Sequence, residues 1–275
     1  MARSPSGEGV VERVVRMLES FDPATPAMTV GELAARAGLP PSTASRLVDQ
    51  LVSHQLLRRD ARGQVRVGVR MWELAARASP AQVLREVSMP FMEDLQAVVG
   101  HHTQLGVLDG RDVLFLERLS ARGAVINVTR IAGRLPLHAS SAGLVLLAHA
   151  SRGVQEQVLA GPLQSYTHST VTDPARLRAL LADVRHQGFA ECRGHIDLAA
   201  TGVAVPVREP SGSVIAGLAL VIPNDGSSTR PRIDVLRTAA RGLERALRGP
   251  RGAAEQRVSC GDAQSEPSAR SMGKP

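Results

Sequence analysis

The chain has 275 residues, which is enough for one large domain or for two of ordinary size. A hydrophobic fraction of 43% excludes wholesale disorder, and an aromatic fraction of only 2% leaves the cores to aliphatic side chains. The net charge of +7 favours a polyanionic partner, although it also suits a merely soluble basic protein. No leader pattern opens the sequence and no apolar run could span a bilayer, so we expect a cytoplasmic protein without a membrane partner.

Apolar residues recur at helical spacing along the first third of the chain. Residues 1–9 precede this pattern, and their small polar side chains predict a disordered lead. Helices are predicted over residues 10–21 and 30–37, a third helix begins at Pro41, and strands are predicted over residues 56–59 and 64–69. Thr29 and Glu32 are spaced to cap the second helix, and Gly38 is placed to end it.

The second and third predicted helices have the residues that a helix-turn-helix requires. Ala34 is small enough for two helices to cross closely, and Gly38 supplies the positive φ of the turn four residues later. The inner faces would carry the apolar residues Leu33, Ala37, Leu39, Ala44, Leu47 and Leu51. The exposed start of the later helix combines short hydroxyl side chains with an arginine, which suits close approach to a DNA major groove. From this helix we expect DNA contacts by Ser42, Thr43, Ser45, Arg46 and Gln50.

The predicted strand pair that follows is strongly basic and is a candidate wing. Asp60-Ala61-Arg62-Gly63 would form its turn, with Arg62 at the tip. Arginines on such a hairpin can enter a minor groove, so the expected DNA contacts include Arg58, Arg59 and Arg62. An ordinary helical hairpin followed by a solvated basic strand pair is the alternative. The joint occurrence of small-residue spacing, a polar helix start and a basic hairpin favours the winged helix-turn-helix.

The pattern changes after Gly100, where strands and helices begin to alternate. A short helix over residues 71–78 and a longer one over residues 81–99 precede this change, and the longer helix is a plausible linker. Beyond it, strands are predicted over residues 103–108, 113–119, 125–131, 203–207 and 213–221, and helices over residues 140–150, 173–187 and 233–247. From Gly249 onward, small and charged residues predict a disordered tail.

Three segments together resemble the IclR family of bacterial transcriptional regulators. The first is the helix-turn-helix within VGELAARAGLPPSTASRLVDQLVSHQLLRRD, residues 30–60. The second, GRLPLHASSAGLVLLA at residues 133–148, is similar to the family's Pro-x-His-x-Ser/Thr-Ala-x-Gly-Lys segment. The third, GFAECRGHIDLAATGVAVPVREPSGSVIAGLALVIP at residues 188–223, is similar to its Gly-Tyr/Phe-Ala and Ala-x-Pro-Val segments. The resemblance covers roughly residues 10–248.

The resemblance implies an α+β protein in which a winged helix-turn-helix is joined by a linker helix to a GAF-like α/β effector-binding domain. The corresponding boundaries are residues 1–9 for the lead, 10–78 for the DNA-binding domain, 79–100 for the linker helix, 101–249 for the effector domain and 250–275 for the tail. It further implies a homodimer or a tetramer, because the family forms dimers or dimers of dimers.

The resemblance also implies a small-molecule pocket on the concave side of the sheet. Carried over residue by residue, its lining is Ser141, Ala142, Cys192, His195, Ala219 and Val221. Such a pocket is rather apolar, with Ser141 and His195 as polar anchors, and suits a small neutral or weakly acidic organic ligand. The chain departs from the family pattern at Leu144, where Lys is usual, at His195, where Glu is usual, and at Ala199, where Gly is usual. For His195, a surface position without a ligand contact remains the alternative.

Other chemistries have weaker support in the sequence. His101 and His102 lack a third ligand at a recognised metal spacing, so no metal and no cofactor are expected. No Gly-x-Ser-x-Gly elbow is present for a serine nucleophile. Two cysteines cannot build a disulfide framework, and Cys192 is either inert packing or a redox sensor.

We therefore expect a ligand-responsive DNA-binding regulator, in the first instance a repressor, with double-stranded operator DNA and a small organic effector as partners. The alternative is an enzyme or scaffold whose helix-turn-helix serves protein contacts. Salt dependence distinguishes them, because several phosphate contacts would lower affinity on the order of 10³-fold between low and moderate salt.

Overall fold

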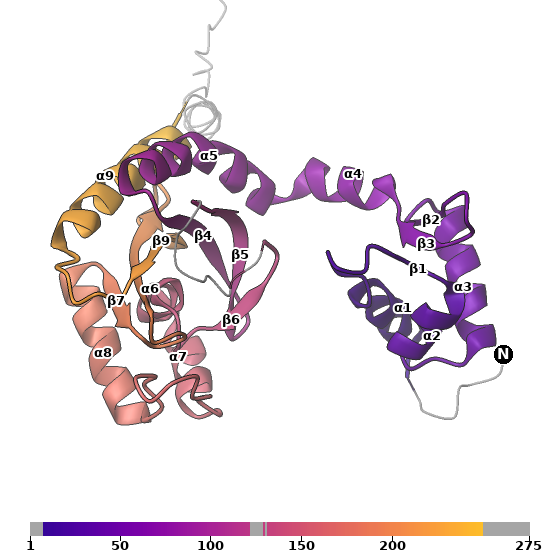
Figure 1. Ribbon diagram of the computed structural model, residues 1–275, viewed down its shortest axis with the longest axis horizontal. Helices are drawn as coiled ribbons and strands as arrows, with labels where there is room; N and C mark the ends of the chain where they lie inside the picture. Colours follow the sequence, from indigo (N-terminus) through magenta and orange to yellow (C-terminus); the bar gives the residue numbers. More distant parts are fainter. Residues whose placement is uncertain (1–7, 122–128, 130, 250–275) are drawn as a thin grey trace, which may run out of the picture. The chain divides into compact units, whose positions relative to one another are not determined.

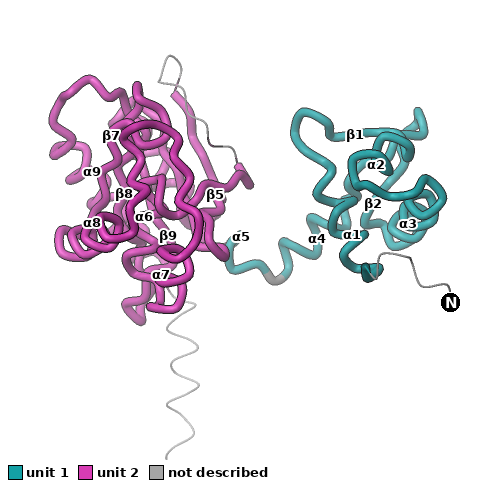
Figure 2. The backbone as a smooth tube through the Cα atoms, turned by 90° about the horizontal axis from the view of Figure 1, so that it is seen from below, with its two compact units in different colours: residues 1–82 teal, residues 83–275 magenta. Residues whose placement is uncertain are grey.

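The computed structural model describes residues 8–121, 129 and 131–249. The backbone divides into two compact units, residues 1–82 and residues 83–275 (Figure 2). The sequence prediction of a strand over residues 125–131 falls largely outside the described residues.

The first unit is a small helical domain with a three-stranded sheet. Its elements are α1 (Val10–Glu19), β1 (Ala27–Met28), α2 (Val30–Arg36), α3 (Pro41–Ser53), β2 (Leu57–Arg59), β3 (Val65–Val67) and α4 (Val69–Ala78) (Figure 1). The strand order is β1-β3-β2, with both pairs antiparallel. This is the predicted helix-turn-helix followed by a hairpin, with β1 as an additional edge strand.

Local sequence signals set the angle between α2 and α3. Thr29 Oγ1 accepts a hydrogen bond from Glu32 N at 3.2 Å, and Thr29 N donates to Glu32 Oε2 at 2.7 Å, so the predicted capping box is present. Gly38 has a φ of +61°, which a side chain would disfavour, and the turn closes as Leu39 N donates to Ala34 O at 2.9 Å. The two helices therefore cross where the sequence predicts.

The core of this unit confirms the predicted inner faces. Every residue assigned to them is buried, and Met17, Met28, Val48, Leu57 and Val65 are further members of the cluster. The apolar residues of α1 are not buried in the same way. Val11 is 74% exposed, and Met17 is the one residue of that helix that is fully buried. The unit thus keeps an apolar strip on its surface.

The second unit is built on one antiparallel sheet. Its elements are α5 (Pro80–Val99), β4 (His102–Asp109), β5 (Asp112–Leu119), β6 (Arg134–Pro136), α6 (Ser141–His149), α7 (Arg152–Leu159), α8 (Pro174–Gln187), β7 (Ala190–Arg193), β8 (Ala200–Arg208), β9 (Val214–Pro223) and α9 (Arg230–Leu247). The strand order is β6-β5-β4-β9-β8-β7. The chain enters this unit within α5, whose first residues belong to the first unit.

Two separate cores flank the sheet. Helices α5 and α9 cover one face over a cluster that includes Met92, Leu218 and Leu236, and α6 covers the other face over a cluster that includes Phe115 and Leu147 (Figure 1). Helix α8 packs on α6 from outside and continues the second cluster. Helix α6 is buried from Ser141 to Ala148, so it runs through the interior of the domain.

The structure adds short elements that the sequence did not reveal. Strands β1, β6 and β7 have two to four residues each, and α7 has eight. Such strands exist through pairing with a longer neighbour, and their own residues show no alternating pattern long enough to detect. The α+β fold itself, a helix-turn-helix followed by an α/β domain, is as predicted.

Removing the cap of α2 tests whether it holds the helix-turn-helix together. In Thr29→Ala we expect the domain to lose about 1 kcal/mol of stability because the amide of Glu32 loses its acceptor. Amide hydrogen exchange along α2 and α3 should then accelerate roughly fivefold. Thr29→Ser, which keeps the hydroxyl, is the matched control and should exchange nearly as the wild type does. Equal acceleration in both variants would contradict a role for the hydroxyl.

Candidate DNA-binding surface and ligand cavity

Helix α3 presents one polar face that nothing in its own domain covers. Pro41 occupies the first turn, where a missing amide hydrogen costs nothing. Ser42, Arg46 and Gln50 are exposed, whereas Thr43 and Ser45 are half-buried beside them. Within the described residues, the Arg46 guanidinium has no hydrogen-bond or ion-pair partner. It is therefore available to an external acceptor, as recognition of a guanine edge requires.

An aspartate organises the β2–β3 hairpin. Asp60 Oδ1 accepts hydrogen bonds from Arg62 N at 2.9 Å and from Gln64 N at 3.0 Å, and Asp60 Oδ2 accepts one from Arg66 Nε at 3.0 Å. The hydrogen bond from Arg66 is the main reason why the pKa of the Asp60 carboxyl lies below its ordinary value. The turn is rigid as a result, and Arg62 lies exposed at its tip.

The other predicted wing residues differ in how free they are. Arg58 is exposed without a partner among the described residues, whereas Arg59 Nη2 lies 2.8 Å from Asp49 Oδ1 of α3. A phosphate would have to compete with Asp49 for Arg59. The sequence prediction overlooked Asp49, and it placed Asp60 in the turn without its hydrogen bonds. These hydrogen bonds could have been predicted, because Asp at the start of a tight turn typically bonds the amide two residues later.

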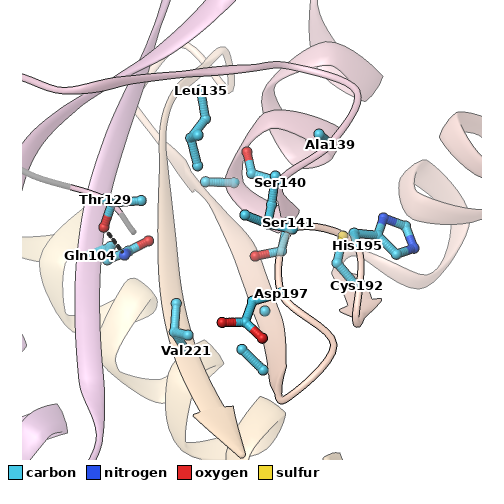
Figure 3. A pocket seen from close by; sticks show the side chains of 14 residues that line it. Gln104, Thr129, Leu135, Ala139, Ser140, Ser141, Cys192, His195, Asp197 and Val221 are labelled. Carbon is cyan, nitrogen blue, oxygen red and sulfur yellow. Dashed lines mark hydrogen bonds between the residues drawn. The ribbon is translucent and has the colours of Figure 1, made fainter. Parts of the chain in front are cut away.

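A cavity lies in the second unit at the N-terminal end of α6 (Figure 3). Side chains from β4, β8 and β9 and from the segment after β7 surround it. Its lining residues are Gln104, Thr129, Leu135, Ala139, Ser140, Ser141, Ala142, Cys192, His195, Ile196, Asp197, Ala200, Gly202 and Val221. A Cβ atom on Gly202 would lie 2.9 Å from Ser141 Oγ, so this glycine keeps the space open where strand and helix approach.

The structure brings five of the six predicted pocket residues together. Ser141, Ala142, Cys192, His195 and Val221 all line the cavity. Ala219 does not, because it lies two residues further back along β9, within the core that α6 covers. Ala219 lies on the same face of the strand as the cavity, but the body of α6 fills the space above it, so the residue does not reach the cavity.

The cavity is more polar than the sequence predicted. Gln104, Thr129 and Asp197 line it, and none of them was predicted. Asp197 Oδ1 accepts a hydrogen bond from Ala199 N at 2.9 Å, and its carboxylate lies between Ser141 and Val221 in the view of Figure 3. The Gln104 amide donates to the Thr129 hydroxyl. Two fixed hydrogen-bonding groups and one carboxylate therefore accompany the apolar wall.

The start of α6 adds partial positive charge to this cavity. Ser140 caps the helix, because its Oγ accepts a hydrogen bond from Gly143 N at 3.1 Å. The amides of Ser141 and Ala142 belong to the first turn and have no acceptor within the helix. Both residues line the cavity, so these amides favour an anionic group there.

His195 lies at the margin of the cavity. Its Nδ1 is buried and has no hydrogen-bond partner among the described residues. Burial, and then the nearby His138, lower the pKa of the imidazole below its ordinary value, so the ring is neutral at neutral pH. In Figure 3 the ring points to the side of Cys192, away from Gln104 and Val221. Asp197 therefore has the more central position of the two.

Other reactive groups show no sign of activity. Burial raises the pKa of the Cys192 thiol well above its ordinary value, so the reactive thiolate is suppressed and inert packing is favoured over redox sensing. Among the described residues, no group of three or more His, Cys, Asp or Glu side chains could hold a metal ion. No helix within that part of the chain is long and apolar enough to cross a membrane.

A helix-turn-helix with a basic hairpin, followed by a domain with a polar-lined cavity, defines a DNA-binding transcriptional regulator. The chain belongs to the IclR family, since residues 10–61 match the IclR helix-turn-helix domain and residues 77–245 match the C-terminal domain of the bacterial transcriptional regulator IclR. Members of this family are regulators and not enzymes, as the sequence predicted.

Individual relatives support this assignment. The crystal structure of an IclR homolog complexed with 4-hydroxybenzoate, from Microbacterium hydrocarbonoxydans, is 49% identical, with a TM-score of 0.83 over 87% of this chain and 99% of that chain. The HTH-type transcriptional regulator XynR of Escherichia coli (strain K12) is 29% identical over 212 residues, 76% of this chain and 84% of the relative. The HTH-type transcriptional repressor AllR of the same strain is 24% identical over 247 residues, 88% of this chain and 91% of the relative.

Arg46 provides a test of base recognition by α3. We expect Arg46→Ala to weaken binding to a selected operator by roughly 1–3 kcal/mol, because a bidentate guanine contact is lost. Binding to unrelated duplex should weaken much less, as measured by fluorescence anisotropy on both DNAs. Arg77→Ala, an exposed arginine of α4, is the control. Equal losses on the two DNAs would place Arg46 on a phosphate.

Arg62 provides the corresponding test of the wing. Arg62→Ala should lower affinity and reduce the slope of log Kd against log salt by about one unit, because one fewer phosphate is neutralised. The hairpin should keep its shape, since Asp60 bonds the backbone amide of residue 62. A salt slope identical to that of the wild type would show that the hairpin does not reach the DNA.

Proposed function

We propose that this protein is a ligand-responsive repressor that binds operator DNA through α3 and the β2–β3 hairpin and releases it when a small organic effector enters the α6 cavity. The observation that carries this proposal is the cavity itself, with first-turn amides, a carboxylate and an apolar wall facing one space. The domain boundaries expected from the sequence, 10–78 for DNA binding, 79–100 for the linker helix and 101–249 for the effector domain, are part of the same proposal.

The effector class follows from the chemistry of the lining. A carboxylate suits the amides of Ser141 and Ala142, and a flat apolar body suits Leu135, Ala139 and Val221. A hydroxyl group on such a molecule could donate to Asp197. A small aromatic hydroxy acid meets all three requirements, and the 49%-identical homolog from Microbacterium hydrocarbonoxydans was crystallised with 4-hydroxybenzoate. We therefore propose this class of effector, with 4-hydroxybenzoate as the first probe.

The direction of regulation is inferred by analogy. AllR, which matches along nearly its whole length, is a repressor. Repression that an effector relieves requires the ligand to bind the DNA-released state more tightly than the DNA-bound state. The test is operator affinity of the full chain, by anisotropy, with and without saturating 4-hydroxybenzoate, together with calorimetry of the ligand alone. Calorimetric binding with unchanged operator affinity would contradict a regulatory role for this ligand.

Exposed apolar side chains on both units support an oligomer. In the first unit Val11, Val69 and Trp72 are each more than half exposed, and in the second unit Val98 is 70% exposed at the end of α5. Exposed apolar side chains that gather into one patch mark surfaces that a partner covers. We propose a homodimer or a tetramer, in which paired helix-turn-helix domains read paired half-sites.

Symmetry of the bound DNA tests this arrangement. We expect a footprint with two-fold symmetry whose half-sites lie about one helical turn apart, or a multiple of it, because two α3 helices must enter successive major grooves. Light scattering of the free protein should give at least a dimer. A monomer that protects a single asymmetric half-site would be incompatible with the proposal.

His195 tests the polar margin of the cavity. We expect His195→Ala to leave operator affinity without ligand within about twofold of the wild type, since the residue belongs to the second unit and the DNA-binding elements belong to the first. The effect of 4-hydroxybenzoate on that affinity should be lost or blunted, because the variant removes an imidazole from the margin of the cavity together with its unpartnered Nδ1. His168→Ala, an exposed histidine outside the cavity, is the matched control. A full response in His195→Ala would exclude His195 and leave Ser141 and Asp197 as the polar contacts.

A further inference from the structure

An irregularity in the sheet directs Phe115 and Glu117, which lie two residues apart on β5, to opposite faces. The register between β4 and β5 shifts at Leu105 and Gly106, so that Gly106 pairs with Phe115 and Leu105 pairs with Glu117. One residue of β5, Leu116, has no opposite partner, which is the definition of a β-bulge. Phe115 consequently packs in the core beneath α6, whereas Glu117 lies on the face that α5 covers.

Glu117 connects the sheet to α5. Its side chain is 4% exposed, and its Oε2 lies 2.5 Å from Nη2 of Arg85. Its Oε1 accepts a hydrogen bond from Arg118 N at 2.8 Å. A buried carboxylate that loses its cation is strongly disfavoured, so Arg85 and the beginning of α5 are held to this point of β5.

Arg118 connects the same point of β5 to the cavity. It pairs in register with Gln104 of β4, on the opposite face of the sheet from Glu117. Its Nη1 donates to the backbone oxygen of Thr129, and the hydroxyl of Thr129 accepts a hydrogen bond from Gln104 (Figure 3). Gln104 and Thr129 both line the cavity. A continuous series of polar contacts therefore runs from the cavity wall through the sheet to α5.

We infer that Glu117 and Arg118, the two residues of β5 that follow the bulge, couple the occupancy of the cavity to the position of α5. A ligand acceptor competes with Thr129 for the Gln104 amide, so occupancy alters the hold of Gln104 on Thr129. The backbone oxygen of Thr129 in turn accepts a hydrogen bond from the Arg118 guanidinium. The backbone amide of Arg118 donates to the Glu117 carboxylate, which pairs with Arg85. Because α5 is the helix through which the chain enters the second unit, a change at Arg85 reaches the segment that connects α5 to the DNA-binding elements. Glu117 and Arg118 act here as positioning residues, and the inference rests on the proposed function of the cavity.

The first experiment measures operator affinity of the full chain with and without saturating 4-hydroxybenzoate, and ligand affinity by calorimetry. In the wild type we expect the ligand to change operator affinity by about tenfold, within the usual range of allosteric coupling. In Glu117→Gln the change should fall to about twofold, while ligand-free operator affinity and ligand affinity remain within about twofold of the wild type. The double variant Arg85→Met with Glu117→Met removes both charges together and guards against a folding defect from one unpaired charge. It should give the same loss of coupling.

The matched control is Glu156→Gln, which removes the exposed ion pair of Arg178 Nη2 with Glu156 Oε2, at 3.0 Å in the same unit. It should keep the full effect of the ligand. A full effect of the ligand on operator affinity in both Glu117→Gln and the double variant would overturn the inference.

A second experiment requires no ligand and separates this inference from the proposed function. In Gln104→Ala, amide hydrogen exchange of α5 around Arg85 should accelerate by about threefold or more, because the contact to Thr129 is lost. Exchange in α9, which packs on the same face of the sheet, should stay unchanged. If 4-hydroxybenzoate fails to affect the wild type, the proposed effector is wrong, and the exchange result alone decides the coupling. Unchanged exchange in α5 would overturn it.

Discussion

The architecture of the second unit depends on burying a helix completely. Helix α6 has no polar face to turn toward water, so it is covered by the sheet on one side and by α8 on the other. The amides of its first turn still need acceptors, and burial takes water away from them. Ser140 satisfies one of these amides, and the remaining ones open on a cavity. A cavity that faces unsatisfied amides is thus the direct result of placing a helix start inside the domain.

In the DNA-binding unit, carboxylates determine which arginines are free. Asp60 holds Arg66 and the turn of the hairpin, and Asp49 holds Arg59 against α3. Arg46, Arg58 and Arg62 are left exposed and without an internal partner in the described part of the chain. This basic surface therefore contains both ion-paired and unpaired arginine side chains. The pairs shape the scaffold, and the free guanidinium groups are the ones that can release counterions from a duplex.

Much of the fold was predictable because its requirements are local. Ala34, Gly38 and Thr29 each satisfy a condition imposed by neighbours a few residues away, so sequence spacing is sufficient to place α2 and α3. Strand β1 forms only because a distant strand, β3, offers free hydrogen-bonding groups, and the four residues of β7 are too few to show an alternating pattern. The assignment of the protein to its family rested on longer segments and was confirmed by the comparisons.

The cavity was predictable in outline, through resemblance, and not in its polar detail. Ala219 shares a strand face with Val221, and the alternation of a strand cannot tell which of the two lies under a helix. Gln104 follows two other polar residues in β4, and Asp197 lies in a segment without regular structure, so neither signals a shared site. The bulge at Leu105 and Gly106, which sends Phe115 and Glu117 to different faces, is invisible to a pattern of period two.

The position of Trp72 gives the molecule an intrinsic optical label. The sequence contains one tryptophan, and it lies on α4 with 66% of its side chain exposed to solvent. An indole in water emits at long wavelength, and its emission moves to shorter wavelength when an apolar surface covers it. Any event that covers α4 can therefore be followed by fluorescence without a dye, and the effector domain contributes no tryptophan background to that signal.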